Sequence, residues 1–216
     1  MKAENLDLFA DLIGRAFTHA MLGFAQITGK KMEIKSFSVR TTQPLEVSQL
    51  LGGPDQVAVG VYLVTEGSAG GYVLLVFDPR VARAFVEMLT GDAGNGGKQS
   101  DEEIERQLID MANGQGSEAL GDFQRSALEE MGNITGSLLL NGLADVSDMA
   151  LVPTPPRVIV DLVGALVDVL ATDPQLSDDA VLVADAAFST SSGEATGTLL
   201  FVPSNKLVGA LEGGGS

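Results

Sequence analysis

Three polar residues at a regular spacing offer the clearest chemistry in the sequence: Ser126, Glu130 and Asn133. Because an α-helix brings residues three and four positions apart onto one face, a helix here would place a carboxylate and a carboxamide one turn apart. A carboxylate can bind a cationic group, and a neutral carboxamide both donates and accepts hydrogen bonds. Together the two groups can hold a partner and orient a water molecule. Ser137 extends the polar stripe, and Pro156 follows Asn133 after twenty-two intervening residues.

The stripe by itself would also fit an ordinary solvated helix face, because surface helices carry polar side chains on one side. Two features argue against that interpretation. Asparagine is a poor residue inside a helix, and Gly132 and Gly136 each cost about 1 kcal/mol relative to alanine. Residues that break local rules tend to lie where function or close packing requires them. The two glycines would let another backbone or a partner's surface approach the helix beside Asn133.

The composition narrows the kind of protein that could carry this stripe. Of the 216 residues, 13 are basic and 29 acidic, so the formal net charge is −16. Such a charge repels nucleic acids and anionic membranes, and we expect no nucleic-acid partner. The absence of cysteine excludes thiolate nucleophiles and cysteine-bound zinc, and His19, the single histidine, lacks the sequence context of a Ser-His-Asp triad. We therefore expect no metal site.

The sequence also carries no signal for export or membrane insertion. No basic segment followed by an apolar run opens the chain, and no apolar stretch approaches the roughly 20 residues of a membrane span. We expect a cytoplasmic protein that does not insert into membranes.

The elements that must position the stripe follow from hydrophobic periodicity. Apolar residues at helical spacing predict helices over residues 6–27, 78–91, 100–111, 118–143 and 161–170. Alternating apolar and polar residues, bounded by turn residues, predict strands over residues 32–39, 57–65, 72–77, 180–188 and 196–202. Residues 151–155 should be extended, the glycine-rich residues 91–99 a flexible connection, and residues 213–216 a disordered tail.

The two halves of the chain repeat one another. In both, two strands, a glycine-containing turn, a proline and a closing helix follow in the same order, and a leading helix precedes each copy. This pattern predicts an α/β (α+β) fold in which a pseudo-twofold repeat of a helix plus antiparallel hairpins shares one sheet covered by helices. We expect a single domain over residues 1–216, with a first pseudo-repeat at 6–91 and a second at 118–213 that carries the polar stripe.

Ser126, Glu130, Asn133 and Pro156 together match the signature of a known family. The signature is Asp or Ser, three residues, Glu, two residues, Asn, twenty-two residues and Pro. It belongs to the CheC/CheX/FliY phosphatases, which act on the phosphorylated response regulator CheY. The chain resembles the CheC branch over nearly its whole length, and the segments EEMGNITGS and PTPPRVIVDLVGALVDVL carry the resemblance around the signature.

The resemblance implies an enzyme, a protein aspartyl-phosphate phosphatase of chemotaxis signalling. Glu130 would pair with a lysine of the receiver domain of CheY, and Asn133 would orient the attacking water. Ser126 would cap the helix or contact the partner, Ser137 would contact the partner, and Pro156 would support the turn beside the helix. Ser126 is not expected to be a nucleophile, because no base is available to activate it. The protein would need no cofactor of its own, since Mg²⁺ is expected in the receiver domain of the partner.

CheC proteins often carry the signature twice, and this chain departs from that pattern. The equivalent positions in the first helix are Asp7, Asp11 and Gly14, so a shorter acid replaces the glutamate and the carboxamide is missing. The expected proline position is Phe37. We therefore expect one competent site in the second half and a degenerate first site with a docking or structural role.

Two alternatives remain at this point. Some CheC proteins resemble regulators more than strong phosphatases, binding phosphorylated CheY or modulating the receptor deamidase CheD, and the chain could be such a non-catalytic regulator. A flagellar switch component of the FliY type is the other alternative. FliY proteins append a switch-binding domain, for which we expect no room in 216 residues.

Overall fold

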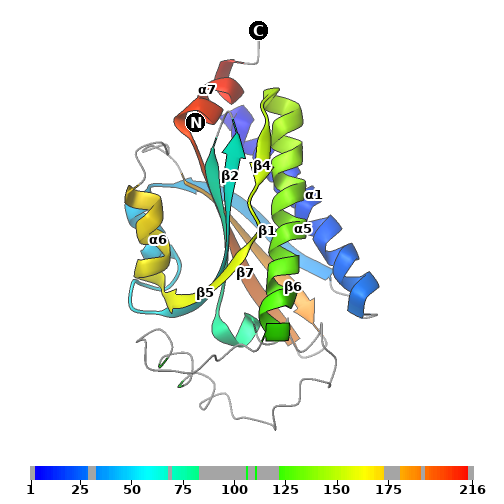
Figure 1. The fold of residues 1–216 in the computed structure, drawn as a ribbon, viewed down its shortest axis with the longest axis vertical. Helices are drawn as coiled ribbons and strands as arrows, with labels where there is room; N and C mark the ends of the chain where they lie inside the picture. Colours follow the sequence, from blue (N-terminus) through cyan, green and yellow to red (C-terminus); the bar gives the residue numbers. More distant parts are fainter. Residues whose placement is uncertain are drawn as a thin grey trace.

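Seven antiparallel strands form one sheet at the centre of the described structure, and helices lie on both of its faces (Figure 1). The structure is a computed structural model that describes residues 3–28, 33–67, 70–82, 106, 110, 122–172, 181–190 and 193–213. The predicted α+β class, with antiparallel hairpins that share one helix-covered sheet, is confirmed.

The strands follow the order β1-β6-β7-β3-β2-β4, and β5 also pairs with β2. Their bounds are β1 (Glu33–Thr42), β2 (Val57–Gly67), β3 (Gly71–Phe77), β4 (Leu151–Pro153), β5 (Arg157–Leu162), β6 (Val181–Thr190) and β7 (Gly193–Pro203). The hairpins β2–β3 and β6–β7 meet through the pairing of β3 with β7. The division into pseudo-repeats at 6–91 and 118–213 stays a prediction.

Each long helix is followed by a strand that joins the hairpin of the other half. The long helices are α1 (Ala3–Thr28) and α5 (Asp122–Ser147). The strand after α1 is β1, which pairs with β6, and the strands after α5 are β4 and β5, which both pair with β2. The two halves therefore exchange strands within the sheet.

The long helices α1 and α5 pack side by side on one face of the sheet (Figure 1). Phe9 and Ile13 of α1 and Leu128 of α5 are fully buried there against Val61 and Phe201 of the sheet. Because side chains alternate along a strand, the residues between them form a second apolar layer on the opposite face.

That second layer is covered by α6 (Val163–Thr172) together with the short helices η1 (Pro44–Glu46) and α2 (Val47–Leu50). Leu74, Val183 and Leu200 are buried in it. The last described element of the chain is α7 (Asn205–Gly213). None of the helices in the described ranges is long and apolar enough to cross a bilayer.

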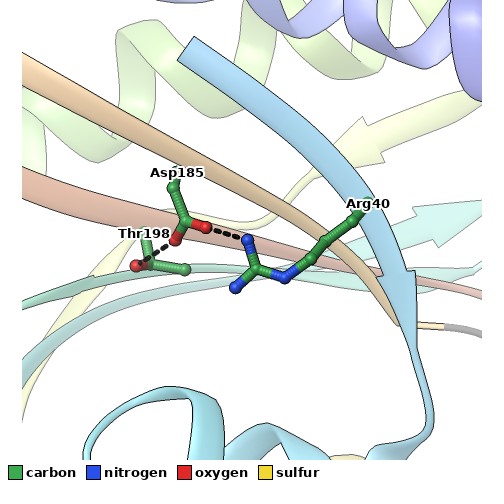
Figure 2. A network of polar contacts seen from close by, with 3 residues as sticks. All are labelled: Arg40, Asp185 and Thr198. Carbon is green, nitrogen blue, oxygen red and sulfur yellow. Dashed lines mark hydrogen bonds and ion pairs between the residues drawn. The ribbon is translucent and has the colours of Figure 1, made fainter. Parts of the chain in front are cut away.

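Part of this second face carries polar side chains on β1, β6 and β7 (Figure 2). Arg40 forms an ion pair with Asp185, which also accepts a hydrogen bond of 2.9 Å from the Thr198 hydroxyl. The Arg40 and Asp185 side chains are 41% and 38% exposed, so solvent screens the pair and it should add little to stability.

Several predicted elements differ from the structure in their bounds. Residues 79–82 begin the predicted helix 78–91, and the Asp78 carboxylate accepts a hydrogen bond of 2.8 Å from the Arg80 N–H at its start. The remainder of that helix, the connection 91–99, most of the helix 100–111 and the tail after Gly213 lie outside the described residues. The start predicted for the long helix at residue 118 also lies outside them, and α5 ends at Ser147 rather than at residue 143.

Three elements were not predicted: η1, α2 and β5. The helix predicted over 161–170 begins two residues too early, because Asp161 and Leu162 still belong to β5. The alternation along β5, with Val158 buried and Arg157 and Ile159 exposed, is a strand pattern, but the six-residue strand merges directly into an apolar helix.

Candidate functional site

Helix α5 presents the three residues of the predicted signature on one exposed side. Ser126, Glu130 and Asn133 are all exposed, and all three line a single open groove of about 450 Å³. Pro156 lines the same groove from the facing segment. The structure therefore brings together the four signature residues, which come from two separate stretches of sequence.

The opposite side of α5 explains why this side faces outward. Leu128, Met131, Thr135 and Leu139 are buried against the sheet and α1. Their spacing of three and four residues fixes the rotation of the helix about its axis, since this is the spacing of one helical face. The polar stripe is thereby directed to solvent.

Two glycines let α5 lie unusually close to the sheet. A Cβ atom on Gly132 would lie 2.4 Å from Val61 Cγ1 and 3.4 Å from Pro156 Cβ. A Cβ atom on Gly136 would lie 2.9 Å from Leu63 Cδ2. The sequence allowed two neighbours for these glycines, another region of the protein's own backbone or the surface of a partner. In the structure they face the protein's own sheet. They place Asn133 directly beside the wall that contains Pro156.

The facing wall of the groove is the segment that connects β4 to β5. Pro153, Thr154, Pro155 and Pro156 all line the groove there. Glu129 joins them from α5. Glu129 and the first three wall residues were missed by the sequence analysis. The cluster of three prolines ending at Pro156 was the available signal for the wall.

The groove is acidic. Among its lining residues two, Glu129 and Glu130, carry carboxylates, and no lining residue in the described structure is basic. Neither carboxylate forms an ion pair or a side-chain hydrogen bond within the described part of the chain. Both are therefore free to bind a cationic group on a partner. The described residues contain no group of three or more His, Asp or Glu side chains that could hold a metal ion.

Ser137 lies one turn beyond Asn133 but does not line the groove. Its half-buried hydroxyl donates a hydrogen bond of 3.4 Å to Asn133 Oδ1. The contact occupies one lone pair of the carbonyl oxygen and directs the amide N–H groups away from Ser137. A role for Ser137 in binding the partner stays a prediction.

The residues predicted to form a degenerate first site lie on α1, and none of them lines the groove on α5. Asp7 and Asp11 are exposed, and Asp11 forms an ion pair with Arg15 on the same helix. A Cβ atom on Gly14 would lie 3.7 Å from Phe37 Cε1, so the aromatic ring packs over this glycine. Phe37 also contacts Phe17 edge-on, with ring centroids 6.0 Å apart.

The sequence resembles a protein of known activity along most of its length. No protein-family model matches the chain. The CheY-P phosphatase CheC of Bacillus subtilis (strain 168) is 25% identical to it over 194 residues, which cover 88% of this chain and 83% of that protein. The chain is thus similar to CheC at low identity. The predicted resemblance to the CheC family is thus confirmed.

Solved structures show the same fold. FliY from Thermotoga maritima superposes with a TM-score of 0.65 at 16% identity, covering 99% of this chain and 96% of that chain. The FliM middle domain from H. pylori superposes with a TM-score of 0.54 at 14% identity, covering 99% of both chains. At these identities the likeness establishes the fold alone, which this chain shares with FliY and with the FliM middle domain.

Proposed function

We propose that this protein acts in chemotaxis by hydrolysing the aspartyl phosphate of the response regulator CheY. The observation that supports the proposal most strongly is the groove on α5, where Ser126, Glu130 and Asn133 lie exposed opposite Pro156. The CheC relative is named a CheY-P phosphatase, which adds independent support. The activity, the partner and the residue roles are all part of the proposal.

The chemistry of the substrate explains what the groove would have to supply. An aspartyl phosphate is a reactive mixed anhydride, and its hydrolysis mainly lacks a well-placed water molecule. Holding that water in line with the scissile bond removes much of the entropic part of the barrier. A neutral carboxamide can do this without bringing another anion near the phosphoryl oxygens, as a glutamine does in GTPases. Asn133 is the proposed water-orienting group.

Glu130 is the proposed docking group. It is one turn from Asn133 and its carboxylate is exposed, so a partner's lysine could pair with it and bring the phosphorylated aspartate over the carboxamide. The protein would supply no cofactor in this scheme. Mg²⁺ bound in the receiver domain of the partner would neutralise charge on the phosphoryl group.

A phosphate-release assay tests the proposal directly. CheY that carries a labelled phosphoryl group on its receiver aspartate is mixed with the protein. The rate at which the label is lost is compared with the rate for phosphorylated CheY alone. Accelerated loss supports the phosphatase. Tight binding without acceleration would instead support a non-catalytic regulator of CheY, and addition of CheD would show whether that enzyme is a second partner.

Replacing Glu130 with glutamine is expected to weaken docking more than catalysis. Loss of a charge-assisted hydrogen bond should raise KM about tenfold and leave kcat within about twofold of the parent. Steady-state hydrolysis over a range of CheY concentrations measures both constants. Asp145→Asn is the matched control. Asp145 is exposed on the same helix, and this substitution changes the net charge by the same amount as Glu130→Gln. An unchanged KM for Glu130→Gln would argue against the docking role.

Replacing Ser137 with alanine is expected to lower kcat about threefold with little change in KM. The hydroxyl restricts the rotation of the Asn133 carboxamide, and a weak hydrogen bond of this kind contributes about 0.5–1 kcal/mol. Ser137→Thr, which keeps a hydroxyl group, is the control. A change confined to KM would instead favour direct contact with the partner.

A further inference from the structure

The wall opposite Asn133 contains a β-bulge. β4 leaves its pairing with β2 at Pro153, and β5 resumes pairing at Arg157. Between these points two residues of β2, Leu63 and Val64, lie opposite the three residues 154–156. One extra residue on one strand is the defining feature of a bulge, and bulges often redirect the chain beside a functional site.

Thr154 holds the bulge to β2 through two hydrogen bonds. Its backbone N–H donates to the Val64 carbonyl oxygen at 2.8 Å, and its side-chain Oγ1 accepts from the Val64 N–H at 3.0 Å. The hydroxyl oxygen thus accepts the hydrogen bond that a backbone carbonyl oxygen would accept in a regular antiparallel pair. The next two residues are prolines, which have no N–H to offer, so the sheet gains no donor from them.

The bulge carries the motif proline to the helix. Pro156 Cβ lies 3.4 Å from the position that a Cβ on Gly132 would occupy, and Gly132 immediately precedes Asn133. Thr154 and Pro156 line the groove together with Asn133. A shift of the bulge would therefore change the width of the groove at the carboxamide.

We propose that Thr154 is a positioning residue for substrate binding, whose side-chain hydroxyl fixes the proline wall of the groove against α5. The proposal rests on the proposed phosphatase function for its kinetic consequence. It predicts that the hydroxyl governs how well CheY docks, whereas the carboxamide of Asn133 governs the chemical step. No other chemistry is assigned to Thr154.

Thr154→Val tests the proposal, because valine keeps the shape of threonine and removes the acceptor. The variant is expected to raise KM for phosphorylated CheY about fivefold, with kcat within about twofold of the parent. Hydrogen exchange at the Val64 N–H, followed by NMR, should become about tenfold faster, since that donor loses its partner. Thr154→Ser keeps the hydroxyl and should restore both values. Thr196→Val makes the same change at an exposed position of β7 and should alter neither.

Three results would overturn the proposal. One is a Thr154→Val variant with unchanged KM and unchanged exchange at Val64. Another is a Thr154→Ser variant as defective as Thr154→Val, which would make the methyl group rather than the hydroxyl the important part. The third is an effect confined to kcat.

Failure of the phosphatase function would be seen separately, as a parent protein that does not accelerate phosphate loss. In that case exchange at Val64 and the NMR signals of the Asn133 side-chain amide still decide the positioning role. Faster exchange with shifted amide signals in Thr154→Val supports the role, and unchanged values of both overturn it.

Discussion

Replacing Asn133 with alanine is expected to slow the hydrolysis of phosphorylated CheY about a hundredfold, or about 3 kcal/mol of activation free energy. The carboxamide is the proposed water-orienting group, and its removal leaves Glu130 free to dock the partner. KM should therefore change little. The protein should not lose stability, because Asn133 is exposed and alanine is the stronger helix former. Single-turnover phosphate release at saturating protein measures the chemical step apart from binding.

Asn141→Ala is the matched control for this variant. Asn141 is exposed on the same helix, two turns beyond the groove, so its replacement should leave both kcat and KM at the parent values. If Asn133→Ala hydrolyses phosphorylated CheY as fast as the parent, Asn133 does not orient the water. A loss shared by both variants would point to a general effect on α5.

The second large effect is expected for Gly132→Ala. The new Cβ would lie 2.4 Å from Val61 Cγ1, and Val61 is fully buried and β-branched, so its side-chain rotation is restricted. Overpacking of this kind costs about 1–3 kcal/mol, and the better helix propensity of alanine offsets at most about 1 kcal/mol of it. We expect a net loss of stability and a shift of α5 away from the sheet. That shift moves Asn133 relative to Pro156 and should lower kcat/KM about tenfold or more.

Denaturant unfolding and the phosphate-release assay measure the two consequences separately. Gly209→Ala is the control, because in the described structure no atom beyond the neighbouring backbone of α7 lies within 4 Å of the added Cβ, and this variant should be slightly more stable than the parent. The double variant Gly132→Ala/Val61→Ala reopens the space and should recover part of the activity. A Gly132→Ala variant as stable and as active as the parent would show that the helix does not depend on this close contact.

The polar face of α5 could be predicted because it follows from helical period alone. Ser126, Glu130 and Asn133 share one side of any helix through these residues, whatever the helix packs against. The two hairpins were predictable for a similar reason, since their alternating strands flank glycine-containing turns. Both predictions depend only on residues that are near one another in the sequence.

What the sequence left undetermined was set by tertiary contacts. Gly132 and Gly136 indicated a close approach, but two kinds of neighbour were compatible with them, and only the packing against Val61 and Leu63 identifies the sheet. The same holds for the bulge. Its proline-rich segment was visible, but the register that makes it a bulge depends on β2, about ninety residues earlier in the chain.

The exchange of strands between the halves means that the groove on the second half depends on a strand of the first half. The bulge that forms the wall of the groove pairs with β2, which lies in the half of the chain where Asp11 and Gly14 stand at the predicted signature positions. A fragment beginning near residue 118 would carry every signature residue and yet lack the scaffold that aligns them.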